Sequence, residues 1–300
     1  MIPISKVPKF IDIIHKSILL RDKDTSLNIF LCGANPTNKK SIRNLIYEKI
    51  KHIPRFNVVF PEWLFSNVLA NKEKNLLDLE TILAKNVDVI ILPIEGYGTI
   101  AELGAFASFE NLAEKIIVIN NVKFKLERGF INIGPINLIK SKNKRNIIYY
   151  GDDDESKVEM IENVVNKLRY STQKLISKDV NNIFQLSRFL FYVIAFFQPI
   201  SKSDIQDYIT FWKNDIEKFL IDPCLELLRL KKYAQVDFPD DEEVYTLNML
   251  GHKYLFDEIL PFMGLRSLAS KLRTDILLLK NRKLNKLDLN KERERLLVAS

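Results

Sequence analysis

Apolar residues follow two alternating patterns through the first half of the chain. Short runs rich in β-branched residues predict buried strands, and segments with apolar residues three or four positions apart predict the helices between them. The expected strands cover residues 28–31, 56–60, 87–92, 115–120 and 145–150. The expected helices cover residues 10–20, 39–52, 76–84, 100–111 and 157–177. This alternation predicts an α/β fold with a doubly wound parallel sheet that helices cover on both faces.

The pattern changes beyond residue 177. Three helical segments come before two short strand-like segments, in the order 187–197, 203–212, 216–232, 233–238 and 244–247. Three helices followed by a hairpin predict an α+β winged helix-turn-helix-like domain. We therefore expect two domains, residues 1–176 and residues 177–300, and the second of them ends in a basic tail.

Most of the net charge lies in that tail. The chain carries +7, and residues 266–300 hold ten Lys and Arg against four Asp and Glu, which leaves +6 there. The loop at residues 237–243, between the two expected strands, is acidic, so phosphates would repel it. The tail therefore indicates contact with a nucleic acid or another partner, and a solvated helix face is the alternative. The candidate contact residues are Arg273, Lys280, Arg282, Lys283 and Lys286.

Composition and spacing argue against several classes of protein. Cys32 and Cys224 lie far apart and are expected to be reduced thiols. Three scattered histidines without partner ligands predict no metal site. The N-terminus lacks a signal-peptide pattern, and the apolar run 189–197 is too short to span a bilayer, so we expect a cytoplasmic protein. Neither a dinucleotide-binding fingerprint nor a P-loop occurs.

The stretch 87–110 carries the candidate site. A strand there leads into a glycine-containing loop and a helix, the arrangement that binds ligands in doubly wound folds. We expect Glu102 in the first turn of that helix, where the helix dipole favours the ionised form that a nucleophile needs. The alternative is that Glu102 only complements the dipole. Candidate substrate-binding residues at the same sheet edge are Cys32, Gly33, Asn35, Pro61, Glu62, Glu80, Glu95, Gly98 and Thr99.

The residue types in this set suit a ligand that carries a sugar. Glycines and a helix N-terminus accommodate phosphate groups. Several carboxylates can hold ribose hydroxyls and attack or stabilise an anomeric carbon with partial positive charge. We therefore interpret the site as one for a nucleotide or nucleoside substrate, with no separate cofactor.

Three motifs make the first domain similar to the nucleoside deoxyribosyltransferase family. They read IFLCGAN, LLDLETILAKNVDVIIL and GYGTIAELGAFA. The resemblance implies that Glu102 is the nucleophile and that Glu80 binds the sugar hydroxyls. Those transferases carry an aspartate where this chain has Gly96, and the neighbouring Glu95 can substitute for it. The loss of that aspartate leads us to expect hydrolysis rather than base exchange.

Further motifs resemble bacterial retron effectors. These are PEWLF at 61–65, ELGAF at 102–106, ENL at 110–112 and FINIGP at 130–135. The resemblance implies a toxin in antiphage defence that a reverse transcriptase and its msDNA, a DNA–RNA hybrid, hold inactive. It also implies hydrolysis of the N-glycosidic bond of NAD or a related nucleotide, and it leaves open a homo-oligomer or a higher assembly.

Two alternative functions stay open. The stretch PIEGYGTIAE is similar to the PGGxGTxxE motif of cytokinin-activating phosphoribohydrolases, although Ile94 and Glu95 stand where that family has two glycines. The other alternative is a non-catalytic regulator that senses nucleotides or binds nucleic acid, in which the winged-helix-like domain has the main role.

Overall fold

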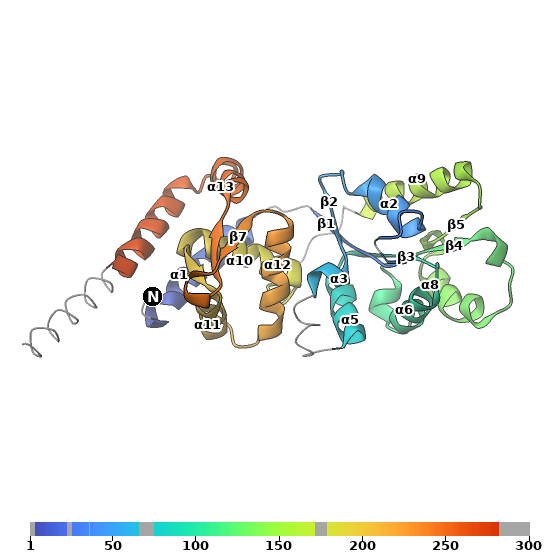
Figure 1. Ribbon diagram of the computed structural model, residues 1–300, viewed down its shortest axis with the longest axis horizontal. Helices are drawn as coiled ribbons and strands as arrows, with labels where there is room; N and C mark the ends of the chain where they lie inside the picture. The colour runs from blue at the N-terminus through green and yellow to red at the C-terminus, as the bar shows by residue number, and fades with distance from the viewer. Residues whose placement is uncertain (1–3, 23–25, 36, 66–74, 172–178, 282–300) are drawn as a thin grey trace, which may run out of the picture. The chain divides into compact units, whose positions relative to one another are not determined.

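The computed structural model describes residues 4–22, 26–35, 37–65, 75–171 and 179–281 (Figure 1). The chain divides into two compact units. Residues 24–176 form one, and residues 1–23 together with residues 177–300 form the other. The leading segment, which sequence analysis placed in the first domain, therefore groups with the C-terminal part of the chain. No helix in the described ranges is long and apolar enough to cross a membrane.

A five-stranded parallel sheet forms the centre of the unit 24–176. Its strands run in the order β2-β1-β3-β4-β5, which confirms the expected parallel sheet. Their bounds are β1 Leu27–Leu31, β2 Phe56–Val59, β3 Val89–Pro93, β4 Ile116–Asn121 and β5 Ile147–Tyr150. In the register, Ile29 lies opposite Val58 of β2 and Val89 of β3. The chain moves outward in opposite directions from the β1/β3 border, and ligands of open α/β sheets bind at such a border.

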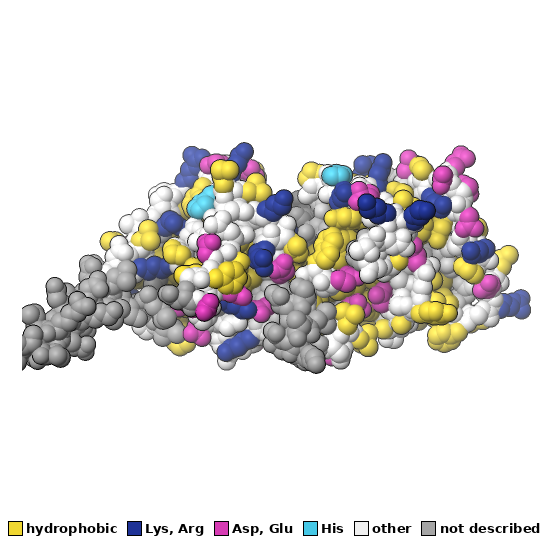
Figure 2. All heavy atoms as spheres, viewed as in Figure 1, with side chains coloured by type: hydrophobic (Ala, Val, Ile, Leu, Met, Phe, Trp, Pro, Cys, Tyr) yellow, Lys and Arg dark blue, Asp and Glu magenta, His cyan; other side chains and the backbone are white. Residues whose placement is uncertain are grey.

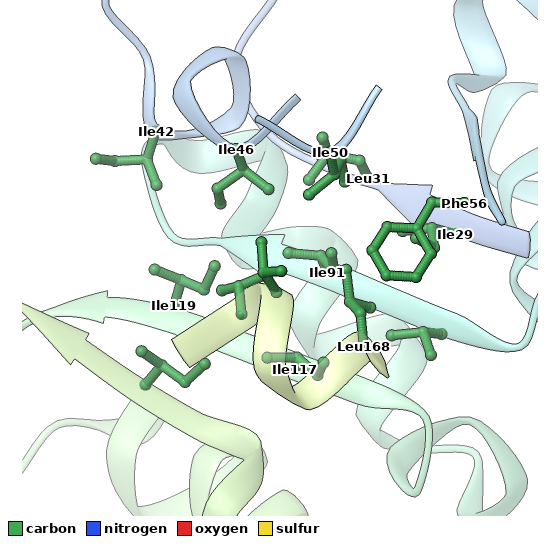
Figure 3. Close-up of a cluster of buried hydrophobic side chains, with 14 of the residues drawn as sticks. Ile29, Leu31, Ile42, Ile46, Ile50, Phe56, Ile91, Ile117, Ile119 and Leu168 are labelled. Atoms are coloured by element: carbon green, nitrogen blue, oxygen red, sulfur yellow. The ribbon is translucent and has the colours of Figure 1, made fainter. Parts of the chain in front are cut away.

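Helices cover both faces of this sheet (Figure 1). Their bounds are α2 Ile42–Ile50, α3 Pro61–Leu64, α5 Leu76–Asn86, α6 Tyr97–Ala107, α7 Glu110–Ala113, α8 Asn137–Lys142 and α9 Asp154–Ser171. Alternate strand residues point to opposite faces. On one face, Ile29 and Ile91 pack with Ile46 of α2 and Leu168 of α9 in a continuous apolar cluster (Figure 3). On the other, the ring of Phe30 lies 5.9 Å from that of Phe106 in α6.

Three helices and a three-stranded antiparallel sheet form the central part of the second unit. In chain order they are α10 Ile183–Phe197, β6 Ile200–Ser201, α11 Lys202–Trp212, α12 Ile221–Leu230, β7 Ala234–Asp237 and β8 Val244–Leu247. The sheet order is β6-β8-β7. Sequence analysis missed β6 because its two residues lie in a break next to Pro199. Almost every residue of α10 is buried, so this helix is the core of the unit.

The N-terminal segment packs within this second unit. Helix α1, Val7–Ile13, continues as a π-helical turn at Ile14–Ile18. The ring of Phe10 lies 6.5 Å from that of Phe197 in α10. Asp22 then accepts hydrogen bonds from Arg188 and from the Tyr192 hydroxyl, both on α10. These contacts explain why the segment belongs with α10 and not with the parallel sheet.

Helices also follow β8, where sequence analysis described only a basic tail. Their bounds are α13 Met249–Lys253, a π-helical turn Tyr254–Ile259, α14 Leu260–Phe262 and a helix over 266–281. Ala269, Leu272 and Ile276 of the last helix form a buried stripe with Leu265, the residue before its first turn. The spacing of these residues is that of one helix face, so this part of the tail packs as an ordinary amphipathic helix.

Candidate functional site

Five chemically active side chains come together at the carboxyl ends of β1, β2 and β3. They are Cys32, Arg43, Glu62, Glu80 and Glu102, and each affects the ionisation of another member of the set. They come from five segments, namely the β1 exit, α2, α3, α5 and α6. Figure 2 shows acidic side chains gathered on the face where α3 and α6 lie. The sheet edge that sequence analysis selected therefore does carry a cluster of carboxyl groups.

The loop after β1 is shaped around Arg43. Gly33 has φ +136°, a backbone conformation that favours glycine. A Cβ atom at this position would lie 2.7 Å from Cβ of Arg43 and 3.0 Å from its Cδ. Gly33 is therefore glycine because the Arg43 side chain lies against it. Next along the loop, Asn35 accepts hydrogen bonds from the backbone N–H and the hydroxyl of Thr37.

Arg43 is only 2% exposed and is held by several partners. Its Nη1 and Nη2 donate to the two carboxylate oxygens of Glu62 over 3.0 and 3.1 Å. Nη1 also donates to the Ala34 carbonyl over 2.8 Å. The guanidinium carbon lies 4.4 Å from the centre of the Phe60 ring. A planar cation with a fixed fork of donors suits this bidentate and stacked position, and a lysine could not reproduce it.

Glu95 and Thr99 fix the loop between β3 and α6. The two carboxylate oxygens of Glu95 accept from the backbone N–H groups of Ile42 and Arg43, over 2.6 and 3.2 Å. Glu95 thus caps the first turn of α2, where a negative charge is favourable. The Thr99 hydroxyl accepts from the backbone N–H groups of Glu95 and Gly96. Both residues were expected to bind substrate, and the structure gives each of them a structural role.

Glu102 lies in the second turn of α6, which corrects the expectation that it sits in the first. The helix begins at Tyr97 and has no acidic residue in its first turn. The dipole therefore does not keep this carboxyl ionised. Burial raises its pKa to about 7, with a further contribution from the negative charge of Glu80. Among the described residues, its buried Oε2 has no hydrogen-bond partner.

Glu80 is the second acid of the site. It extends from α5, a helix that the Asn75 side chain caps, and the residue is 8% exposed. Burial raises its pKa to about 7, and the charge of Glu62 adds to the effect while Arg43 opposes it. Two interacting carboxyls of this kind titrate as a pair. Near neutral pH each of the two carboxyls is therefore partly protonated.

The remaining expected substrate-binding residues have simpler environments. Burial raises the pKa of the Cys32 thiol well above its usual value, so this cysteine stays protonated beside Glu102. Pro61 is the first residue of α3, a position where proline is favourable. Nothing lies within 4 Å of a Cβ placed on Gly98, so the first turn of α6 is open at that point.

Two of the residues that were expected to contact nucleic acid donate hydrogen bonds to backbone carbonyls inside the second unit. Arg273 donates to the Ala195 carbonyl, and Lys280 donates to the carbonyls of Phe197 and Pro199. These carbonyls lie at the C-terminal end of α10, where cations are favourable. Burial lowers the pKa of both basic groups. Arg282, Lys283 and Lys286 lie outside the described residues.

Arg43 is the site residue that sequence analysis did not select. It looked like a solvated position on the polar side of an amphipathic helix. One signal was available, because Arg43 follows the cap residue Ser41 by two positions, and a cation in the first helical turn opposes the dipole.

Within the described part of the chain, no group of three or more His, Cys, Asp and Glu is arranged to hold a metal ion.

Comparison with known proteins adds information about the family. The model of a family described as STM3845 retron effector protein matches residues 39–236, which include Arg43, Glu62, Glu80 and Glu102. An Escherichia coli protein named "Retron Ec86 putative ribosyltransferase/DNA-binding protein" is 36% identical over 183 residues, 57% of this chain and 60% of the relative. The E. coli "Retron Ec73 putative ribosyltransferase/DNA-binding protein" is 38% identical over 123 residues, 39% of each chain. The chain thus spans less than two thirds of the length of these relatives.

Proposed function

Because the chain belongs to the STM3845 retron effector protein family, we propose that it is a toxic effector of an antiphage system that hydrolyses an N-glycosidic bond. The substrate is NAD or a related nucleotide, and Glu102 is the catalytic residue. The observation that carries the proposal is the pair of carboxyls of the buried Glu80 and the partly buried Glu102, each with a pKa of about 7. Carboxyl groups with raised pKa values at the ligand edge of an α/β sheet are typical of sites that act on glycosidic bonds.

The proposed chemistry uses Glu102 in its ionised form and Glu80 in its protonated form. The ionised Glu102 attacks C1′ of the ribose, or stabilises the oxocarbenium ion that forms there, while the bond from C1′ to nitrogen breaks. Nicotinamide leaves from NAD as a neutral molecule, because the bonding electron pair returns to its positively charged ring nitrogen. Water then attacks C1′, displaces the Glu102 carboxylate where it has bonded to C1′, and releases its proton to the solvent, which leaves Glu102 unmodified. Glu80 orients the sugar hydroxyls, and its proton lets it act as a donor as well as an acceptor.

The structural roles of Glu95 and Thr99 support hydrolysis over base exchange. The family that carries out exchange has an aspartate where this chain has Gly96. Glu95, the neighbouring carboxylate, is engaged by two backbone N–H groups of α2. No second acid of the loop is therefore free to position an incoming base.

The second unit has the element order of a winged helix-turn-helix, and we assign it that role. Its third helix, α12, carries acidic side chains that are already paired. Asp222 pairs with Lys202, and Glu226 pairs with Arg229. The hairpin between β7 and β8 is acidic as well. Phosphates would repel this hairpin, so we assign binding of the retron msDNA to other surfaces, with the basic residues beyond 281 contacting the nucleic acid.

A substrate panel tests the catalytic proposal. Purified protein is incubated with NAD, deoxynucleoside monophosphates and nucleosides, and the products are separated by chromatography. We expect release of nicotinamide or a free base with Glu102-dependent kinetics. Turnover of nucleoside monophosphates alone favours the phosphoribohydrolase alternative. Binding of a nucleotide without any turnover favours the regulator alternative, which the words "DNA-binding protein" in the names of both relatives support.

A binding assay tests the assignment of the tail. The full-length chain and a variant that ends at residue 281 are titrated with the retron msDNA at several salt concentrations. We expect the truncated chain to bind more weakly and with a smaller dependence on salt, because fewer phosphates are neutralised. Equal binding and equal salt dependence would contradict the assignment.

A further inference from the structure

We propose that Arg43 is the positioning residue of the acid pair: its guanidinium joins the β1 exit loop to Glu62 and places a fixed positive charge beside Glu80 and Glu102. The inference rests on the proposed function for its catalytic meaning, but its geometry is independent of the reaction. Arg43 acts through other groups and is not assigned a contact with substrate.

The first argument is mechanical. Two segments meet at the Arg43 side chain, namely the β1 exit loop through the Ala34 carbonyl and the segment after β2 through the Phe60 ring and Glu62. The backbone N–H of the same residue donates to Glu95, which belongs to the loop before α6. One residue thus ties together loops that follow β1, β2 and β3. Gly33 has no Cβ because Arg43 occupies that space.

The second argument is the cost of burying this charge. A guanidinium that is 2% exposed loses nearly all contact with bulk water, and only close partners can compensate for that loss. Glu62 supplies the opposite charge, yet its own side chain is 44% exposed. Arg43 Nε has no partner among the described residues. A chain that needed only structural packing at this position could use an apolar residue at lower cost, so a charged group here indicates a functional requirement.

The third argument is the charge balance around the acids. The titratable groups that face Glu80 and Glu102 are Cys32 from the β1 exit, Arg43 from α2 and Glu62 from α3. Arg43 opposes the rise in pKa of both acids, whereas Glu62 adds to it. Among the residues that the structure describes, Arg43 is the only cation that affects the pKa values of both acids. Without it, the acid pair would hold its protons to higher pH, and less of Glu102 would be ionised at neutral pH.

The decisive variant is Glu62→Gln, which keeps the shape of the Arg43 partner and removes its charge. Because Glu62 is half exposed, we expect the variant to fold. It removes the negative charge with which Glu62 itself raises both pKa values, and it leaves the positive charge of Arg43 uncompensated, so the pKa values of Glu80 and Glu102 should both fall. Arg43→Lys is the complementary variant, since it keeps a positive charge but loses the bidentate geometry. Glu48→Gln is the matched control, because Glu48 lies on the same helix and pairs with Lys51 at the surface.

Two readouts separate this inference from the proposed function. In the ¹³C NMR titration of the glutamate carboxyls, we expect Glu80 and Glu102 to titrate at lower pH in Glu62→Gln and at unchanged pH in Glu48→Gln. In the pH profile of kcat/KM, the ratio of the value at pH 6 to that at pH 8 should rise about threefold or more in Glu62→Gln. In Arg43→Lys, we expect kcat to fall while the chain stays folded.

The outcomes are distinct. If no variant and no wild-type preparation turns over an N-glycoside, the proposed function is wrong, and the NMR titration still decides whether Arg43 sets the ionisation of the pair. If Glu62→Gln folds and leaves both titrations and the pH profile unchanged, the inference about Arg43 is overturned. If Arg43→Lys does not fold, the Glu62→Gln titration alone decides the question.

Discussion

Removing the charge of Glu102 should stabilise the unit 24–176 at alkaline pH, although it removes the catalytic group. The carboxyl has a pKa of about 7 in the folded chain against 4.5 for an unperturbed glutamate. Because the pKa of Glu102 is higher in the folded chain than in the unfolded chain, folding favours the protonated carboxyl. Its stabilising contribution to the free energy of unfolding is therefore complete below about pH 4.5. It is lost as pH rises through about 7. Glu102→Gln stays neutral at every pH and escapes this loss.

The magnitude follows from the difference between the two pKa values. One pKa unit corresponds to about 1.4 kcal/mol, so the free energy of unfolding should be about 3 kcal/mol lower when Glu102 is ionised at pH 8. For a unit of this size, escaping that loss corresponds to a rise in Tm of roughly 6–12 °C. At pH 5 the carboxyl is protonated in the folded chain and mostly ionised in the unfolded chain, so the variant should differ from wild type by much less. The expected signature is a stabilisation that grows with pH.

The assay can observe this unit separately from the other. The chain has two tryptophans, Trp63 and Trp212, and only Trp63 lies in the unit 24–176. Trp63 packs on Phe60, with ring centres 4.3 Å apart, so its fluorescence should report loss of the fold around the site. Urea unfolding in a Trp212→Phe background, at pH 5 and pH 8, gives the free energy of unfolding. Glu159→Gln, at an exposed position of α9, is the matched control.

The control variant and the pH dependence together decide whether this prediction is right. We expect the control to change the free energy of unfolding by less than about 0.5 kcal/mol at both pH values. A Glu102→Gln variant that destabilises the unit at pH 8 would contradict this reasoning. So would an equal change in the free energy of unfolding at pH 5 and pH 8. Either result would mean that Glu102 is not the acid with a raised pKa that the mechanism requires.

Three further changes test other parts of the structure. Gly33→Ala should destabilise the unit 24–176 by about 2 kcal/mol or more in urea unfolding, because the new Cβ meets Arg43 and the positive φ disfavours alanine; an unchanged midpoint would refute the close contact. Asp22→Asn should destabilise the second unit by about 3 kcal/mol in thermal unfolding, because it leaves Arg188 without its buried counter-charge; a loss below about 0.5 kcal/mol would show that the ion pair has little effect. Lys280→Met should increase amide hydrogen exchange in residues 266–281 about tenfold or more, because the carbonyls of Phe197 and Pro199 lose their donor; unchanged exchange would show that the apolar stripe alone holds the helix.

The strands could be predicted well because their pattern has one cause. A parallel strand that is covered on both faces reads as a nearly continuous apolar run, as in Val89–Pro93 and in the first four residues of Ile116–Asn121, so no partner needs to be known to recognise it. The start of α6 was harder to predict from the sequence. Its cap residue is Gly96, and its first residues, Tyr97 and Gly98, are exposed and carry no apolar periodicity. Glu102 was therefore placed one turn too close to the helix end.

The site could be predicted only in part, because its remaining members depend on contacts between distant segments. Glu80 and Glu102 were selected from their place at the sheet edge, and motifs that resemble a known family then indicated their roles. Arg43 could not be found in this way, because its burial depends on Glu62 and on a carbonyl of the β1 exit loop. A count of charges also overstated the basic surface of the tail. Arg273 and Lys280 are used by backbone carbonyls of α10, a role that no composition reveals.

The most direct test of the central claim is the rate of N-glycosidic bond cleavage by wild type and by Glu102→Gln. Both proteins are purified without reverse transcriptase or msDNA, shown to be folded, and incubated with NAD and with the nucleotide panel. We expect the wild type to release nicotinamide or a free base and the variant to lose activity by a factor of about 10³ or more, because glutamine has no negative charge with which to attack or stabilise C1′. Equal rates in the two proteins would contradict the account.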